Sequence, residues 1–167
     1  MMLFYAAFAV CLACYCVHAY YHRQEHTGNP SARYDKNVKY VVFGGWIAWF
    51  AMVFFDSTKG GSALMQDAGT LLGTVGILLV VLSYTHIPFR DPKKLITSGI
   101  YKLVRHPTYY GSILMVAGVP MVFGSMMALY TSPIWIGFML YWTLQEEKYL
   151  AVRYKKDWAA YRKKTII

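Results

Sequence analysis

Charged residues are scarce in this sequence of 167 residues: only 15% are charged, whereas 57% are hydrophobic. In a typical soluble domain about 25% of the residues are charged, so this scarcity excludes an ordinary water-soluble fold. Internal repeats, low-complexity tracts and linkers long enough to separate domains are also missing. We therefore expect a single membrane domain that comprises residues 1–167.

Cysteine is rare as well, and the three cysteines lie close together in the first hydrophobic stretch, at Cys11, Cys14 and Cys16. This placement inside an apolar helix argues against disulfides, and we interpret the cysteines as small apolar residues. The same stretch lacks a preceding basic segment and a small-residue cleavage site. We therefore expect it to be a retained membrane span and not a signal peptide.

Long hydrophobic runs are abundant in place of charge. A transmembrane helix needs roughly 20 mostly apolar residues, and five stretches approach this length: Met1–Tyr20, Val38–Phe55, Ala68–Thr85, Tyr109–Tyr130 and a shorter run from Ser132. The pattern predicts an all-α polytopic membrane protein with about five transmembrane helices. Residues 1–85 would supply three N-terminal spans, and residues 86–167 a loop, a helical hairpin and a C-terminal amphipathic helix.

Local signals refine this prediction at two helices. Gly69, Gly73 and Gly76 form a small-residue face in the third stretch, which is typical of closely packed membrane helices. Proline fits the first position of a helix because its missing amide hydrogen has no intrahelical partner there. Pro107 therefore predicts a helix start with His106 as the cap, and the helix amides would face the cytosol.

The basic residues are distributed very unevenly. Sixteen of the 17 Lys and Arg lie in the first connection, in the third connection, or after Glu147, and only Lys59 lies elsewhere. With the N-terminus outside, all sixteen would lie on the cytosolic side, in agreement with the positive-inside rule. The net charge of +9 therefore indicates contact with membrane lipids and not with nucleic acid. We expect an integral membrane protein with a cytosolic C-terminus and a cytosolic active site.

The last hydrophobic run is too short to cross a bilayer by itself. The 14 residues from Ser132 to Gln145 would span about 21 Å, against a hydrocarbon core of about 30 Å. Either the hairpin does not cross, or the helix continues and places Glu146 and Glu147 at the inner face, where carboxylates are usually paired or functional. After the glutamates, four apolar residues recur on one helix face and predict an amphipathic helix that lies on anionic lipid. They are Leu150, Tyr154, Trp158 and Tyr161.

Two charged clusters, Arg105-His106 and Glu146-Glu147, would meet at the cytosolic end of this hairpin. They could form a buried ion pair, or they could hold a ligand that carries both charges. S-adenosylmethionine fits the second interpretation, because its carboxylate would suit Arg105 and its ammonium and ribose hydroxyls the glutamates, with its adenine on neighbouring tyrosines. We favour the ligand, which in this interpretation keeps the two charges apart.

Three segments in the second half of the chain carry a family resemblance. They are Leu-Ile-Thr-Ser-Gly-Ile-Tyr at 95–101, Arg-His-Pro-Thr-Tyr-Tyr-Gly at 105–111, and the Glu146-Glu147 pair. Their order resembles the isoprenylcysteine carboxyl methyltransferase and phospholipid methyltransferase family, whose pattern is Gly-x-Tyr, then Arg-His-Pro-x-Tyr-x-Gly, then a pair of glutamates. The resemblance covers residues 86–164 and implies an S-adenosylmethionine-dependent methyltransferase.

The resemblance also implies roles for particular residues. The acceptor would be a lipophilic small molecule or a lipid-modified substrate dissolved in the membrane, and most of the acceleration would come from positioning. Candidate catalytic bases are His106 and Glu147, with His86 as a further candidate. The residues implied to bind the cofactor are Leu95, Ile96, Tyr101, Arg105, His106, Pro107, Tyr109, Glu146, Glu147 and His86.

The sequence departs from this pattern at one position. The isoprenylcysteine enzymes have an arginine one helical turn before the glutamates that meets the substrate carboxylate, and Trp142 stands there in this chain. A carboxylate acceptor is thereby placed in doubt. An amine, a thiol or a phenol-like group on a lipid therefore remains an alternative to isoprenylcysteine.

Three other interpretations remain open. A membrane scaffold or transporter subunit would use the Arg and Glu clusters only as an ion pair. Membrane sterol reductases are similar in this half of the chain and use NADPH, although they are longer. Metal binding is conceivable because four potential ligands recur every fourth residue on one helix face, at Cys14, His18, His22 and His26. We expect this face to be a row of polar side chains at the membrane boundary and not a metal site.

Overall fold

Every regular element of the structure is a helix within the residues that the computed structural model describes, 1–26, 38–85 and 95–166. The all-α prediction is therefore confirmed. The elements are α1 (Met2–His26), α2 (Val38–Phe55), α3 (Ala63–Tyr84), the 3-10 helix η1 (Gly99–Lys102), α4 (Pro107–Val122) and α5 (Met126–Arg162).

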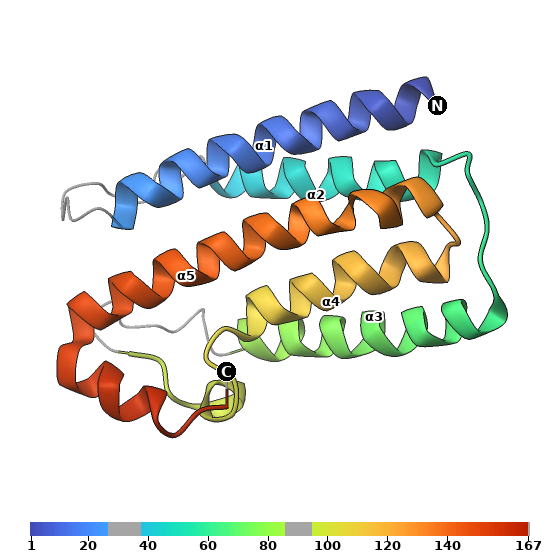
Figure 1. Ribbon diagram of the computed structural model, residues 1–167. Helices are drawn as coiled ribbons and strands as arrows, with labels where there is room; N and C mark the ends of the chain where they lie inside the picture. Colours follow the sequence, from blue (N-terminus) through green and yellow to red (C-terminus); the bar gives the residue numbers. More distant parts are fainter. Residues whose placement is uncertain (27–37, 86–94, 167) are drawn as a thin grey trace.

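The helices form a bundle of two hairpins with α5 between them (Figure 1). α1 packs along α2, α3 packs along α4, and α5 contacts both α1 and α4. Within the described ranges, three helices are long and apolar enough to cross a membrane, over Met2–Tyr21, Val38–Phe55 and Ala63–Tyr84. The three predicted N-terminal spans are thus found, and the third begins five residues earlier than predicted. The crossing of α4 and α5 remains a prediction.

The turn between α4 and α5 lies earlier in the chain than predicted. α4 ends at Val122 and α5 begins at Met126, so the predicted single span Tyr109–Tyr130 is wrong. Gly124 makes the turn with φ +61°, a conformation that favours glycine, and the backbone amide of Gly60 donates to its carbonyl at 2.9 Å. Pro133, a residue type that often ends helices, lies inside α5.

This earlier turn resolves the length of the last span. From Met126 to Gln145 the helix extends over 20 residues, which at 1.5 Å each gives about 30 Å, the thickness of the hydrocarbon core. α5 continues past Gln145 through both glutamates, whereas its crossing of the bilayer, the point that separates the two alternatives, remains a prediction. Glu146 and Glu147 then follow directly after a full crossing length.

The N-terminus of α5 is held by Asp56, which follows α2. Its Oδ2 accepts hydrogen bonds from the amides of Met127 at 2.8 Å and Ala128 at 3.2 Å, and its Oδ1 from the amide of Thr58 at 2.7 Å. Burial by itself raises the pKa of Asp56, but these hydrogen bonds outweigh it and hold the pKa below the ordinary value of 3.8. Asp56, which directly follows α2, thus caps the N-terminus of α5.

Glycines set the close contact between α3 and α4. A Cβ at Gly76 would lie 2.6 Å from the carbonyl oxygen of Gly111, and one at Gly69 would lie 2.7 Å from that of Gly118. At Gly73 the nearest atom would be a Val119 methyl at 3.9 Å, an ordinary contact. The predicted small-residue face is confirmed, and backbone contact requires glycine at Gly69 and Gly76.

Candidate functional site

The predicted charged clusters meet at the end of the bundle where α4 begins. His106 is the N-cap of α4 and Pro107 its first residue, as predicted, and the amide of Tyr110 donates to the His106 carbonyl at 3.1 Å. His106 is only 4% exposed. α5 passes this point 20 residues after its start and presents Glu146 and Glu147 to the loop that precedes α4.

Four charged side chains form one cluster there, which we call the Arg–His–Glu cluster: Arg105, His106, Glu146 and Glu147. Nε of Arg105 lies 2.9 Å from Oε1 of Glu147, and Nε2 of His106 lies 2.9 Å from the same oxygen. Nδ1 of His106 lies 3.5 Å from Oε2 of Glu146. The prediction that a ligand separates Arg105 from the glutamates is therefore wrong for Glu147, because the hairpin brings the two charges into direct contact.

The cluster changes the protonation of His106. Burial by itself lowers the pKa of His106, but the hydrogen bonds and negative charges of Glu146 and Glu147 outweigh it and raise the pKa above the ordinary value of 6.5. A carboxylate beside each ring nitrogen favours the imidazolium, the form in which both nitrogens are donors. A protonated His106 cannot accept a proton, which weighs against its predicted role as a base.

The end of α5 covers this cluster. Lys155 interrupts the helix with φ 43° and ψ −107°, and the residues after it turn back beneath the bundle, so that the C-terminus lies near η1 (Figure 1). The ring centroid of Trp158 lies 6.3 Å from that of His106, and the Tyr161 hydroxyl donates to the Tyr101 carbonyl at 2.6 Å. Both side chains are buried, so the prediction that they lie on lipid is wrong.

Residues 163–166, which follow α5, complete the cover of the cluster. Nη1 of Arg105 donates to Oγ1 of Thr165 at 3.0 Å, and the amide of Ile166 donates to the Leu103 carbonyl at 3.0 Å. Sequence reasoning missed Thr165, Trp158 and Tyr161 as parts of the site. Their periodicity was visible, but an apolar face fits a lipid surface and a protein surface equally well.

The remaining predicted residues lie at different distances from the cluster. Tyr109 is half-buried with its ring 6.2 Å from that of His106, and Pro107 is buried. Burial is the largest influence that raises the pKa of Tyr101, whose hydroxyl hydrogen-bonds Thr108. Leu95 and Ile96 are half-buried just before η1, and His86 lies outside the described residues.

Trp142 occupies the place of the missing arginine. It is buried between α5 and α1, with its ring centroid 5.1 Å from Tyr15 and 4.3 Å from His18. His18 thus packs on an indole, and among the side chains that the structure describes no group of three potential metal ligands occurs. The side chains of His22 and His26 lie outside that part of the chain, and all three cysteines are free thiols.

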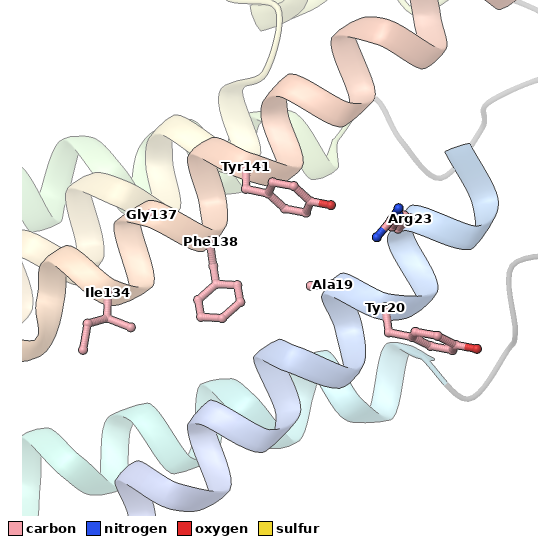
Figure 2. A pocket seen from close by; sticks show the side chains of 7 residues that line it. All are labelled: Ala19, Tyr20, Arg23, Ile134, Gly137, Phe138 and Tyr141. Atoms are coloured by element: carbon pink, nitrogen blue, oxygen red, sulfur yellow. The ribbon is translucent and has the colours of Figure 1, made fainter. Parts of the chain in front are cut away.

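A cavity of about 510 Å³ lies apart from the cluster, between α1 and α5 (Figure 2). None of the predicted site residues that the structure describes lines it. Its lining residues are Ala19, Tyr20, Arg23, Ile134, Gly137, Phe138 and Tyr141.

Comparison with known proteins places the chain in a family. A phospholipid methyltransferase family model matches residues 65–157, more than half of the chain and all of the Arg–His–Glu cluster. The chain therefore belongs to the phospholipid methyltransferase family. This family of membrane methyltransferases is the one that the sequence motifs resemble, so that prediction is confirmed.

Curated relatives agree with this assignment. A protein-S-isoprenylcysteine O-methyltransferase of Schizosaccharomyces pombe is 34% identical over 121 residues, which are 69% of this chain and 51% of the relative. The enzyme of the same name from Dictyostelium discoideum is 32% identical over 82 residues, 44% of this chain and 32% of that protein. The chain thus spans about a third to a half of these relatives. No solved structure matches it.

Proposed function

We propose that this protein is an S-adenosylmethionine-dependent methyltransferase that acts on a lipophilic acceptor dissolved in the membrane. The observation that carries the proposal is that one methyltransferase family model covers every residue of the Arg–His–Glu cluster. Two further points belong to it: α4 and α5 cross the bilayer, and the cluster faces the cytosol. If the chain crosses the bilayer five times, sixteen of its 17 Lys and Arg fall in connections on one side, and this supports the orientation.

The chemistry of the cluster fits the cofactor beside the Arg105–Glu147 pair and not between its members. Nε and Nη1 of Arg105 carry its hydrogen bonds, and no residue in the described part of the chain accepts from Nη2. That nitrogen would bind the cofactor carboxylate. The Glu146 side chain is 35% exposed, against 19% for Glu147, so Glu146 would bind the ammonium or the ribose hydroxyls.

The other predicted residues would surround these charges. Tyr109 and Tyr101 would provide aromatic faces for the adenine, and Leu95 and Ile96, which precede η1, would also contact the cofactor. The sequence motifs imply the same role for His86. When bound, the cofactor supplies an electrophilic methyl group. Trp158 and Tyr161 exclude water from the cluster, because both are buried against it. The protein would contribute mainly by aligning donor and acceptor.

The contacts within the Arg–His–Glu cluster limit the kind of methyl acceptor that the site could use. His106 and Glu147, the predicted bases, are tied to each other and to Arg105, so neither is well placed to remove a proton. An acceptor that arrives deprotonated needs no base. This favours a lipophilic carboxylate over a protonated amine or a thiol, and the names of the relatives, protein-S-isoprenylcysteine O-methyltransferase, agree with an oxygen acceptor.

The direct test is methyl transfer. Purified protein in detergent is incubated with methyl-labelled S-adenosylmethionine and a total lipid extract, and label in the organic phase is counted. We expect incorporation by the parent and by Arg153→Ala, whose exposed arginine lies on α5 away from the cluster. Glu146→Ala should abolish it. Equal labelling with Glu146→Ala would refute the site.

One observation favours a second candidate, a non-enzymatic membrane scaffold. The Arg105–Glu147 contact of 2.9 Å is what a purely structural ion pair would show. Under this alternative, S-adenosylmethionine would not raise the melting temperature. A thermal-shift comparison of S-adenosylmethionine with NADPH separates the scaffold, the methyltransferase and a reductase, because only a cofactor that binds the folded state stabilises it.

A further inference from the structure

The guanidinium of Arg105 is anchored at two of its three nitrogens by two separate parts of the chain. Its Nε donates to Oε1 of Glu147 on α5 at 2.9 Å, and its Nη1 donates to Oγ1 of Thr165, beyond the end of α5, at 3.0 Å. The guanidinium is planar and its donors form a rigid fork. Two anchored nitrogens therefore determine the direction of Nη2, the nitrogen that would bind the cofactor carboxylate.

The hydroxyl of Thr165 serves this arginine as an acceptor. Arginine can only donate hydrogen bonds, so Oγ1 of Thr165 accepts from Nη1 of Arg105. The single proton of the hydroxyl then remains for the Tyr161 carbonyl, 3.4 Å away. Thr165 is only 9% exposed, so water has little access to this contact.

The segment that carries Thr165 is held in place without this hydroxyl. The amide of Ile166 donates to the Leu103 carbonyl at 3.0 Å, and the Tyr161 hydroxyl donates to the Tyr101 carbonyl at 2.6 Å. Both acceptors lie in or next to η1, near the C-terminus in Figure 1. These two hydrogen bonds fix the segment, so its anchoring does not account for the contact between the Thr165 hydroxyl and the guanidinium.

We propose that Thr165 is a positioning residue that acts through Arg105 and makes the site selective for a cofactor with a carboxylate. This inference rests on the proposed function, in which Arg105 binds the carboxylate of S-adenosylmethionine. Thr165 does not touch the cofactor; it holds the guanidinium in the binding orientation before the cofactor arrives. A side chain that is already ordered loses less entropy on binding, and the affinity rises accordingly.

The Thr165 hydroxyl makes the shortest of three contacts at Nη1 of Arg105. The carbonyls of Arg162 and Thr165 lie 3.3 Å and 3.4 Å from this nitrogen, and both would remain if the hydroxyl were removed. Removal should therefore loosen the guanidinium without releasing it. We expect the affinity for S-adenosylmethionine to fall about tenfold, the effect of one hydrogen bond to a charged group.

The test compares S-adenosylmethionine with decarboxylated S-adenosylmethionine by isothermal titration calorimetry of the full chain in detergent. The parent should bind the form with the carboxylate more tightly. Thr165→Val and Thr165→Ala, which lack the hydroxyl, should bind S-adenosylmethionine about tenfold more weakly and the decarboxylated form like the parent. Thr165→Ser keeps a hydroxyl and should retain the selectivity of the parent.

Two results would overturn the proposal. Equal losses of affinity for both ligands would mean that Thr165 supports only the structure, and an unchanged affinity for S-adenosylmethionine would mean that its hydroxyl does not position Arg105. Retained binding of the decarboxylated form shows that a variant is folded, so a selective loss cannot come from unfolding.

A matched control comes from α3. Thr70→Val removes an exposed hydroxyl that donates to the Gln66 carbonyl at 2.9 Å, and it should bind both ligands like the parent. The same loss of selectivity with Thr70→Val would contradict the assignment to Thr165.

Failure of the proposed function gives a different result. A folded parent would then bind neither ligand, and this inference would fall with it. If the parent binds both ligands equally well, Arg105 does not select the carboxylate, and this inference alone is overturned.

Discussion

Nε of Arg105 lies 2.9 Å from Oε1 of Glu147, although 42 residues separate them in the chain. Their side chains are 14% and 19% exposed, so each charge has lost most of its contact with solvent and is the nearest opposite charge of the other. The contact joins the start of α4 to α5 and holds the two helices in register at one end of the bundle. It is therefore both a structural clasp and, in the proposed function, one wall of the cofactor site.

Removing one charge of the Arg105–Glu147 ion pair should destabilise the protein more than removing both charges. Arg105→Met alone removes the nearer arginine of Glu147, which keeps His106 at 2.9 Å and Arg162 at 3.8 Å, and should lower the free energy of unfolding by about 2 kcal/mol. Adding Glu147→Leu should recover part of this loss, since hydrophobic replacements of buried pairs are often tolerated. Chemical denaturation in mixed micelles measures both values. Additive effects of the two substitutions would show that the contact carries no coupling energy.

The raised pKa of His106 predicts a pH dependence of stability. A folded-state pKa above the unfolded value near 6.5 means that the stabilisation is complete below pH 6.5 and is lost as pH rises through the folded pKa. The melting temperature of the parent should therefore fall between about pH 6 and pH 8.5 more than that of His106→Gln. Parallel profiles for the two proteins would mean that His106 does not gain a proton on folding.

Asp56 should be a stronger determinant of stability than its position after α2 suggests. Asp56→Ala removes the acceptors of the Met127 and Ala128 amides and should cost about 1–2 kcal/mol. Asp67→Ala is the control, since Asp67 is exposed on α3 and its loss should change little. Both are measured by unfolding in the same micelles. A cost for Asp67→Ala as large as that for Asp56→Ala would contradict the capping role.

Two of the three glycines of α3, Gly73 and Gly76, should respond differently to the same added methyl group. Gly76→Ala would place its Cβ 2.6 Å from a backbone oxygen, whereas Gly73→Ala would meet its nearest atom at 3.9 Å. Overpacking of this kind costs about 1–3 kcal/mol, so Gly76→Ala should unfold at lower denaturant than the parent. Gly73→Ala should be tolerated. Equal midpoints would show that α3 and α4 can separate without loss.

The fold could be predicted from sequence where one residue type determines the backbone. Pro107 fixed the start of α4, and Gly69 and Gly76 the contact with α3, because each depends on a local property of a single residue. The turn at Gly124 was missed because glycine is common in membrane helices, and the predicted span continued through it to Tyr130. The contact of Gly124 with Gly60, distant in sequence, holds the turn at this position.

The candidate site was predicted in its residues but not in its arrangement. The motifs identified Arg105, His106, Glu146 and Glu147, yet whether opposite charges pair or hold a ligand depends on distances that the sequence does not contain. The backward turn at Lys155 was equally hidden, since φ 43° at a lysine has no local sequence signal. Long-range packing determines such features, and periodicity alone does not.

Cofactor binding tests the central claim most directly. Isothermal titration calorimetry of S-adenosylmethionine with the purified protein in detergent should give saturable binding. Glu146→Ala and Arg105→Ala should abolish it while the helical circular dichroism stays unchanged, and Arg153→Ala should bind like the parent. Undiminished binding by Glu146→Ala and Arg105→Ala, or the absence of binding by a folded parent protein, would contradict the account.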